Sequence, residues 1–211
     1  FDDIAPLNNH EVQQSNEELI VDPGFNHAVK YILLNVDWDG FVTEISKYKT
    51  KYDFQSNIIS TVVWAIANKT SSSVNSDGYE NIDHNHQYLY LSNHRDIVLD
   101  AGLFNIILHE KGFNTTEIAI GDNLLVLPWI KKLVRLNKSF IVQRGVSVRQ
   151  MLLVSKHLSE YIHYAIREKK ESVWLAQREG RAKDSNDRTQ GSLLKMLSLS
   201  PDNGNFIDNL I

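Results

Sequence analysis

The segment from residue 88 to residue 112 changes its hydrophobic pattern from that of a strand to that of a helix within a few residues. Residues 88–91 form an uninterrupted aromatic and aliphatic run, which is typical of a strand buried on both faces. From Asp96 to Gly112 the apolar residues recur at helical spacing. Asp96 suits the N-cap of a helix and Gly112 suits the C-cap. We therefore expect His94 in a turn at the carboxyl end of a strand, where open α/β sheets bind ligands.

The second half of the chain continues this alternation. Apolar runs predict strands at 116–120, 139–145 and 172–176, and helical patterns lie between them at 124–134 and 147–170. The connections are long enough for crossovers between parallel strands. The sequence therefore predicts an α/β domain with a parallel, mostly parallel or mixed sheet flanked by helices.

The first 80 residues are expected to form a helical extension that precedes an α/β domain over 81–211. Residues 1–21 are polar, lack a sustained apolar period, and predict a loosely ordered lead-in. Helices are expected from Pro23, over 41–48 and over 54–67, before a polar linker near the border. The later segment 124–134 contains a proline and predicts either a kinked core helix or a segment that leans into lipid headgroups.

Composition and charge limit the possible functions. The chain has 42% hydrophobic and 23% charged residues, as in soluble globular proteins, and no cysteine, which excludes disulfides, thiolate metal sites and a cysteine nucleophile. No apolar run is long enough to predict a membrane span.

The charges are distributed unevenly along the chain. Residues 1–120 carry 7 Lys and Arg against 17 Asp and Glu, whereas residues 121–190 carry 14 against 7. The excess positive charge of residues 121–190 would attract phosphate groups, an acidic carrier protein or an anionic membrane surface. The alternative is that these charges only lie on solvated helix faces.

Parallel strands would bring several chemically useful residues to one edge of the sheet. With Asp96 or Asp100 as an orienting carboxylate, His94 could act as a general base; the alternative is a turn histidine with a backbone hydrogen bond. The guanidinium groups of Arg144 and Arg181 match phosphate geometry, or else they form surface salt bridges. The sequence contains no convincing set of metal ligands, so no metal site is predicted.

Three segments, in this order, resemble the first three sequence blocks of the glycerolipid acyltransferase superfamily. They are Asn-His-Arg-Asp-Ile-Val-Leu-Asp at 93–100, Ser-Phe-Ile-Val-Gln-Arg at 139–144 and Val-Trp-Leu-Ala-Gln-Arg-Glu-Gly-Arg at 173–181. The superfamily includes glycerol-3-phosphate and 1-acylglycerol-3-phosphate acyltransferases. The resemblance covers roughly residues 88–190.

The resemblance implies transfer of a fatty acyl group from acyl-CoA or acyl carrier protein to a hydroxyl of glycerol phosphate or lysophosphatidate in phospholipid biosynthesis. It implies His94 as general base, with Asp100 as its partner and Asp96 as the alternative. The implied substrate-binding residues are Arg144, Glu179, Gly180, Arg181 and Lys183. The resemblance implies no metal and no bound cofactor, and it implies a cytoplasmic protein associated peripherally with the inner face of the membrane.

The match also departs from the superfamily pattern. The superfamily aspartate would fall at Leu99, so Asp100 is one residue late, and we favour a one-residue insertion. The arginine of the third block would fall at Ala182, with Arg181 or Lys183 as the substitute. The proline-containing fourth block does not appear, so the α/β domain is expected to be incomplete at its carboxyl end. These departures motivate a second hypothesis, a catalytically silent module that binds lipid or a carrier protein.

Overall fold

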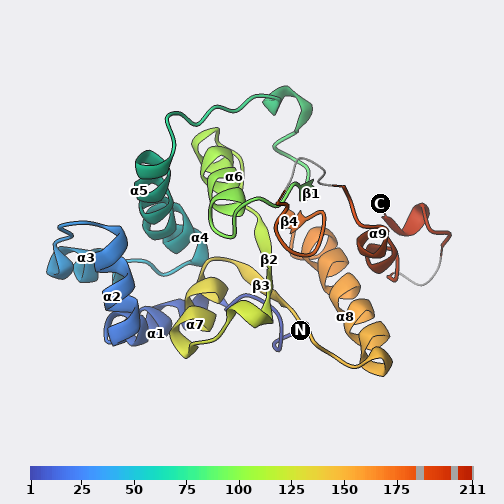
Figure 1. The fold of residues 1–211 in the computed structure, drawn as a ribbon, viewed down its shortest axis with the longest axis horizontal. Coiled ribbons are helices and arrows are strands. Elements are labelled where there is room, and N and C mark those ends of the chain that lie inside the picture. The colour runs from blue at the N-terminus through green and yellow to red at the C-terminus, as the bar shows by residue number, and fades with distance from the viewer. Residues whose placement is uncertain (184–187, 201–203, 211) are drawn as a thin grey trace.

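A computed structural model describes residues 1–183, 188–200 and 204–210. Within these residues, four strands form one parallel sheet in the order β1-β4-β2-β3, which confirms the predicted α/β fold (Figure 1). The strands are β1 (Leu89–Ser92), β2 (Glu117–Gly121), β3 (Ser139–Val142) and β4 (Val173–Ala176).

The register of the sheet aligns the carboxyl ends of its strands. Ser92 at the end of β1 pairs with Ala176 at the end of β4, and Gly121 at the end of β2 pairs with Val142 at the end of β3. The turns that follow the four strands therefore leave the sheet at the same edge.

Helices cover both faces of the sheet. On one face, Leu158 and Ile162 of the long helix α8 pack with Phe140 of β3 and with Val173 of β4. The opposite face, to which Trp174 points, packs against Ala101 of α6. The helices of this part of the chain are α6 (Leu99–Glu110), α7 (Pro128–Leu136), α8 (Val148–Arg167) and α9 (Gly191–Leu197), with 3₁₀ turns at Tyr79–Asn81, Asp122–Leu124 and Asp208–Leu210.

The helical extension has its own core, centred on Phe25 and Phe54 and closed by Leu136 of α7. Asp22 caps the second helix by accepting hydrogen bonds from the next backbone amides, as its Asp-Pro start predicts. The elements are α1 (Asn9–Ile20), α2 (Pro23–Ile32), α3 (Trp38–Ile45), α4 (Lys51–Asp53), the π-helical segment Phe54–Ile59 and α5 (Ser60–Thr70). No helix in the described residues is both long and apolar enough to cross a bilayer.

The expected loose lead-in at residues 1–21 is wrong. A capping box between Asn8 and Glu11 starts α1, and this helix buries Val12 and Leu19 completely. Ahead of α1, the carbonyl of Ile4 accepts a hydrogen bond from the Ile141 amide of β3 at 2.9 Å. The apolar residues of this segment are sparse, so their burial depends on tertiary partners that a local pattern does not reveal.

Two further expectations about helices need correction. Pro128 does not kink a helix; it occupies the first turn of α7, where its missing N–H costs no helical hydrogen bond. Met151 belongs to the apolar pattern that predicts the helix at 147–170, which suggests burial, yet it is 53% exposed on α8. Val148 and Leu152 in the same first turns are exposed as well, so the helical spacing of apolar residues does not indicate burial there.

Candidate active site

A cavity of about 490 Å³ lies at the carboxyl edge of the sheet. Four turns supply its polar lining, one after each strand: His94 after β1, Asn123 after β2, Arg144 after β3, and 178–181 after β4. The rest of its lining is largely apolar, with Ile97, Ala101, Ile118, Ile120, Leu124 and Trp174. The cavity thus combines an imidazole, cationic groups and an apolar wall.

His94 and Asp100 form a close pair at this edge. The Nδ1 atom of His94 lies 3.1 Å from Oδ2 of Asp100, and the two side chains are only 18% and 19% exposed. The same carboxylate oxygen accepts the backbone N–H groups of Arg95 at 2.7 Å and Asp96 at 3.0 Å. Asp100 therefore holds both the imidazole and the turn that carries it.

Asp96 has a different contact. Its Oδ1 accepts hydrogen bonds from the amides of Val98 and Leu99, both at 2.8 Å, at the start of α6. This is the capping contact that the sequence predicts, although α6 begins at Leu99, two residues later than a cap at Asp96 implies. His94 and Asp100 are six residues apart, and the turn between them wraps around the Asp100 carboxylate, which brings the two side chains together.

The His94–Asp100 contact also assigns a role to each imidazole nitrogen. When the proton is on Nδ1, it is donated to Asp100, and Nε2 becomes the acceptor nitrogen of the ring. A carboxylate in this position also stabilises the imidazolium that forms when Nε2 takes up a proton. The pair can therefore act as a general base at the cavity wall.

Arg144 crosses the end of β2 to reach the cavity. Its backbone amide donates to Oδ1 of Asp122 at 3.1 Å, and its guanidinium forms an ion pair with Glu179. A Cβ at Gly121 would lie closest to Oδ1 of Asn123, and 2.6 Å from Nε of Arg144, so a larger residue here would force these side chains to shift. Sequence reasoning assigned no role to Gly121 or Asp122; a Gly-Asp pair directly after a strand was the available signal.

The turn after β4 is fastened to the turn after β1. The amide of Gln177 donates to the carbonyl of Ser92 at 2.9 Å, and the amide of Ala182 donates to the carbonyl of His94 at 2.7 Å. Gly180 has a φ of 72°, a conformation that favours glycine. This turn brings Arg181 into the cavity lining, next to the histidine segment.

The other two residues expected in this turn differ in position. Glu179 lines the cavity and orients the Arg144 guanidinium through their ion pair. Lys183 is exposed and is not among the described residues that line the cavity. The structure therefore brings together five of the predicted residues around the cavity and places Asp100 directly behind one of them. The five are His94, Arg144, Glu179, Gly180 and Arg181.

A second cavity, of about 330 Å³, adjoins the first. The two share lining residues that include Arg144, Arg178 and Glu179. The second cavity extends between α8 and α9, where it is lined by apolar side chains that include Val154, Leu158, Leu193 and Met196. Sequence reasoning did not predict it, because it forms between two helices that are distant along the chain.

The fold and site define a class: α/β proteins with a histidine–aspartate pair and arginines around one cavity at the carboxyl edge of a parallel sheet. The family model described as Acyltransferase matches residues 73–196, which include all four strands. The chain therefore belongs to the glycerolipid acyltransferase family, and the resemblance of its sequence blocks is confirmed. No curated protein matches the sequence.

Proposed function

We propose that this acyltransferase moves a fatty acyl group from acyl-CoA or acyl carrier protein to a hydroxyl of glycerol 3-phosphate or lysophosphatidate, a step of phospholipid biosynthesis. One observation carries the proposal: a single cavity has His94, backed by Asp100, and arginines that include Arg144 and Arg181 in its lining. A reaction between a hydroxyl and a thioester needs a base, and a phosphate-bearing acceptor needs cations near that base.

In the proposed mechanism, Nε2 of His94 takes the proton of the acceptor hydroxyl as the hydroxyl oxygen bonds to the thioester carbonyl carbon. The tetrahedral intermediate collapses with cleavage of the carbon–sulfur bond, and the imidazolium returns the proton to the departing sulfur. Asp100 stabilises the positive charge of the imidazolium between these two steps. The products are the ester and a free thiol, and no metal or bound cofactor takes part.

The two cavities suggest how the substrates divide the space. The phosphate of the acceptor would bind Arg144 and Arg181 in the first cavity, because guanidinium groups match phosphate oxygens. The acyl chain would enter the adjoining apolar cavity between α8 and α9. Arg144 lies in the lining of both, where the carbonyl and the acceptor would meet.

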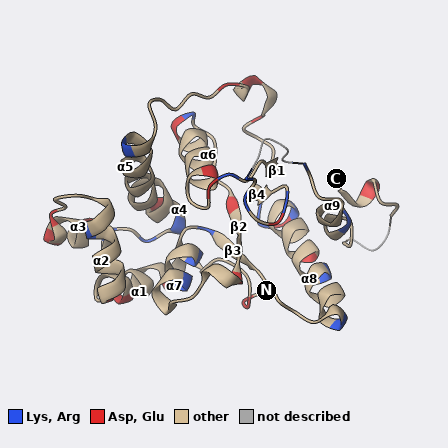
Figure 2. Ribbon diagram, in the orientation of Figure 1, with Lys and Arg blue, Asp and Glu red and all other residues tan. Residues whose placement is uncertain are grey.

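The surface around the cavities supports peripheral association with the cytoplasmic face of a membrane. The segments that line the two cavities also carry exposed apolar side chains, and we call these the apolar rim: Ile97, Val126, Leu127, Val148, Met151 and Leu152. Figure 2 shows Lys and Arg along α8 and on the turn after β4. Apolar side chains next to cations suit an anionic lipid surface, from which a lipid acceptor would enter the site.

The first test measures acyl transfer from an acyl thioester to each acceptor. We expect His94→Ala to lower kcat by roughly 10²–10⁴-fold, the usual contribution of a general base. His27→Ala is the matched control, because His27 is an exposed histidine on α2. Full turnover in His94→Ala would refute the assignment of the base. Vesicle binding without any thioester consumption by the wild-type chain would favour the silent binding module instead.

A further inference from the structure

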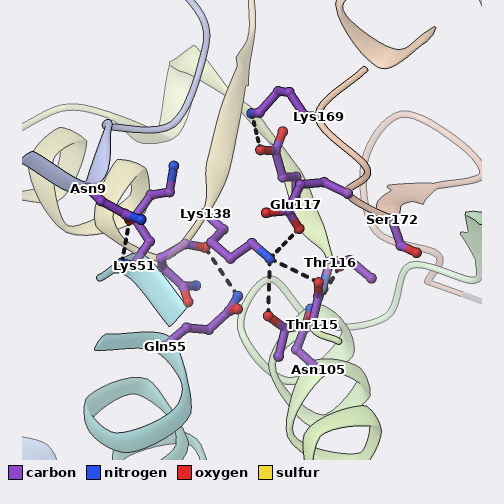
Figure 3. Close-up of polar contacts among 12 residues, drawn as sticks. Asn9, Lys51, Gln55, Asn105, Thr115, Thr116, Glu117, Lys138, Lys169 and Ser172 are labelled. Carbon is purple, nitrogen blue, oxygen red and sulfur yellow. Dashed lines mark hydrogen bonds and ion pairs between the residues drawn. The ribbon is translucent and has the colours of Figure 1, made fainter. Parts of the chain in front are cut away.

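A polar cavity of about 220 Å³ lies at the amino edge of the sheet, opposite the proposed active site. Its lining includes residues just before two strands: Lys138 directly precedes β3, and Glu171 lies two residues before the start of β4. The remaining lining that matters here consists of Asn9, Lys51, Asn114 and Lys170. Figure 3 shows Lys51, Lys138 and Lys169 on three separate segments around this part of the molecule.

Two of the lysines occupy backbone positions that favour glycine. Lys138 follows the end of α7 with a φ of 54°, and Lys170 follows the end of α8 with a φ of 57°. The comparable position after α6 is Gly112, with a φ of 79°. A non-glycine residue in this conformation is strained, and such strain is often found at functional sites. Both exceptions direct a lysine to the same cavity.

The charges in this region do not balance. Lys138 donates to Glu171 at 2.7 Å and to the carbonyl of Thr115 at 3.0 Å, and Lys169 forms an ion pair with the buried Glu117. Each carboxylate is thus matched by one ammonium group. Among the residues that the structure describes, the ammonium groups of the half-buried Lys51 and of the exposed Lys170 have neither a hydrogen-bond nor an ion-pair partner.

The environment of Lys51 favours an anion beside its ammonium group. Burial lowers the pKa of Lys51 below its usual value of 10.5, and the positive charges of Lys169 and Lys138 lower it further, whereas Glu117 and Glu171 act in the opposite direction. An anion next to Lys51 would offset both the cost of burying the charged ammonium and the repulsion from the neighbouring lysines.

We propose that this cavity binds a doubly charged phosphate group, either inorganic phosphate or a small phosphomonoester. Lys51 and Lys170 supply the two unmatched positive charges. Asn9 uses its side-chain oxygen to accept the Lys51 amide at 3.1 Å, which leaves its NH₂ group to donate to the ligand. The carboxylate of Glu171 also lines the cavity, but Lys138 neutralises it. Because the cavity lies at the opposite edge from His94, it is a separate site from the one at which the substrates of the proposed reaction would bind.

The test titrates the whole chain with inorganic phosphate, and separately with glycerol 3-phosphate, by calorimetry at constant ionic strength. We expect saturable binding that Lys51→Met weakens roughly tenfold, the effect of losing one charge-assisted contact. Lys170→Gly should weaken it comparably while keeping or raising the thermal midpoint of the unliganded protein, since glycine relieves the positive φ. Lys49→Met, which removes an exposed lysine outside the cavity lining, is the matched control.

A second variant distinguishes phosphate binding at the amino edge of the sheet from binding at the carboxyl edge. Arg144→Ala should keep the phosphate affinity of this cavity, although it removes a proposed acceptor contact at the other edge. Binding of inorganic phosphate, alone or together with glycerol 3-phosphate, supports the proposal if the lysine variants weaken it. The proposal is overturned by the absence of saturable phosphate binding, by unchanged affinity in both lysine variants, or by binding that only Arg144→Ala removes.

Discussion

Asp100 has more contacts than an orienting carboxylate strictly needs. One of its oxygens accepts from the His94 imidazole and from two backbone amides of the same turn. In the part of the chain that the structure describes, the side chain of Asp96, four residues earlier, accepts hydrogen bonds only from the backbone amides of Val98 and Leu99 at the start of α6. The two aspartates therefore differ in what their loss should change.

We expect Asp100→Asn to lower kcat by roughly 10²–10⁴-fold, because an amide neither stabilises the imidazolium nor reliably selects the Nδ1–H tautomer. Asp96→Asn should leave kcat nearly unchanged, since asparagine also caps helices well. Steady-state kinetics with thermal midpoints for both variants separates the effects. Equal losses of kcat in the two variants would contradict the assignment of Asp100.

Gly121 is a second residue whose importance depends on a close approach. A methyl group there would meet Oδ1 of Asn123 and Nε of Arg144, whereas a methyl group at Gly191 would meet no atom within 4 Å. We expect Gly121→Ala to displace Arg144 and raise the KM of the acceptor roughly tenfold or more, the effect of losing a hydrogen bond to a charged group.

Gly191→Ala is the control for this substitution and should keep the wild-type KM. Arg144→Ala should raise the acceptor KM in the same direction as Gly121→Ala, and both should affect the thioester KM less. An unchanged acceptor KM in both variants would remove Arg144 from phosphate binding.

At the scale of elements, β2 is attached to α8 through a buried charge. Glu117, the first residue of β2, is fully buried and accepts the Tyr161 hydroxyl at 2.5 Å together with the Lys169 ammonium. Burial and the neighbouring Glu117 carboxylate both raise the pKa of Tyr161, so the phenol stays protonated and donates. This cluster joins the start of a central strand to the end of the longest helix.

We expect Lys169→Met to destabilise the fold by about 3–5 kcal/mol, because it leaves a buried carboxylate without its cation. Tyr161→Phe should cost about 1–3 kcal/mol through the lost hydrogen bond. Adding Glu117→Gln to Lys169→Met should recover part of the loss, since no buried charge then remains unpaired. Urea unfolding of the variants tests this, and additive losses would show that the groups are not coupled.

At the scale of the whole molecule, the apolar rim lies around the two cavities at the carboxyl edge. Leu152 is 64% exposed on α8, and Leu34, between α2 and α3, is 65% exposed on a segment that Figure 1 places far from α8. The two leucines therefore offer matched positions for a test of which surface meets the membrane.

We expect Leu152→Glu to weaken sedimentation with anionic vesicles at least roughly tenfold, because a carboxylate opposes both insertion and attraction to anionic lipid. Leu34→Glu should bind vesicles as the wild type does. Equal binding by both variants, or loss in Leu34→Glu alone, would place the lipid contact on another surface.

Much of this architecture follows from local sequence. Apolar runs predict the strands β1 to β4, and apolar residues at helical spacing predict the helix α8. The lengths of the connections imply that the strands are parallel. Parallel strands then place the residues that follow them at one edge, so the convergence of His94, Arg144 and the turn after β4 was predictable.

Other features depended on contacts between distant parts of the chain. The sequence left Asp96 and Asp100 as alternative partners, and the path of a turn around one carboxylate distinguishes them. The burial of α1, the close approach at Gly121 and the cavity with unmatched lysines likewise arise from packing. The spacing of apolar residues along a segment indicates the average environment of that segment. The partner of a single polar group depends instead on which distant segment folds against it.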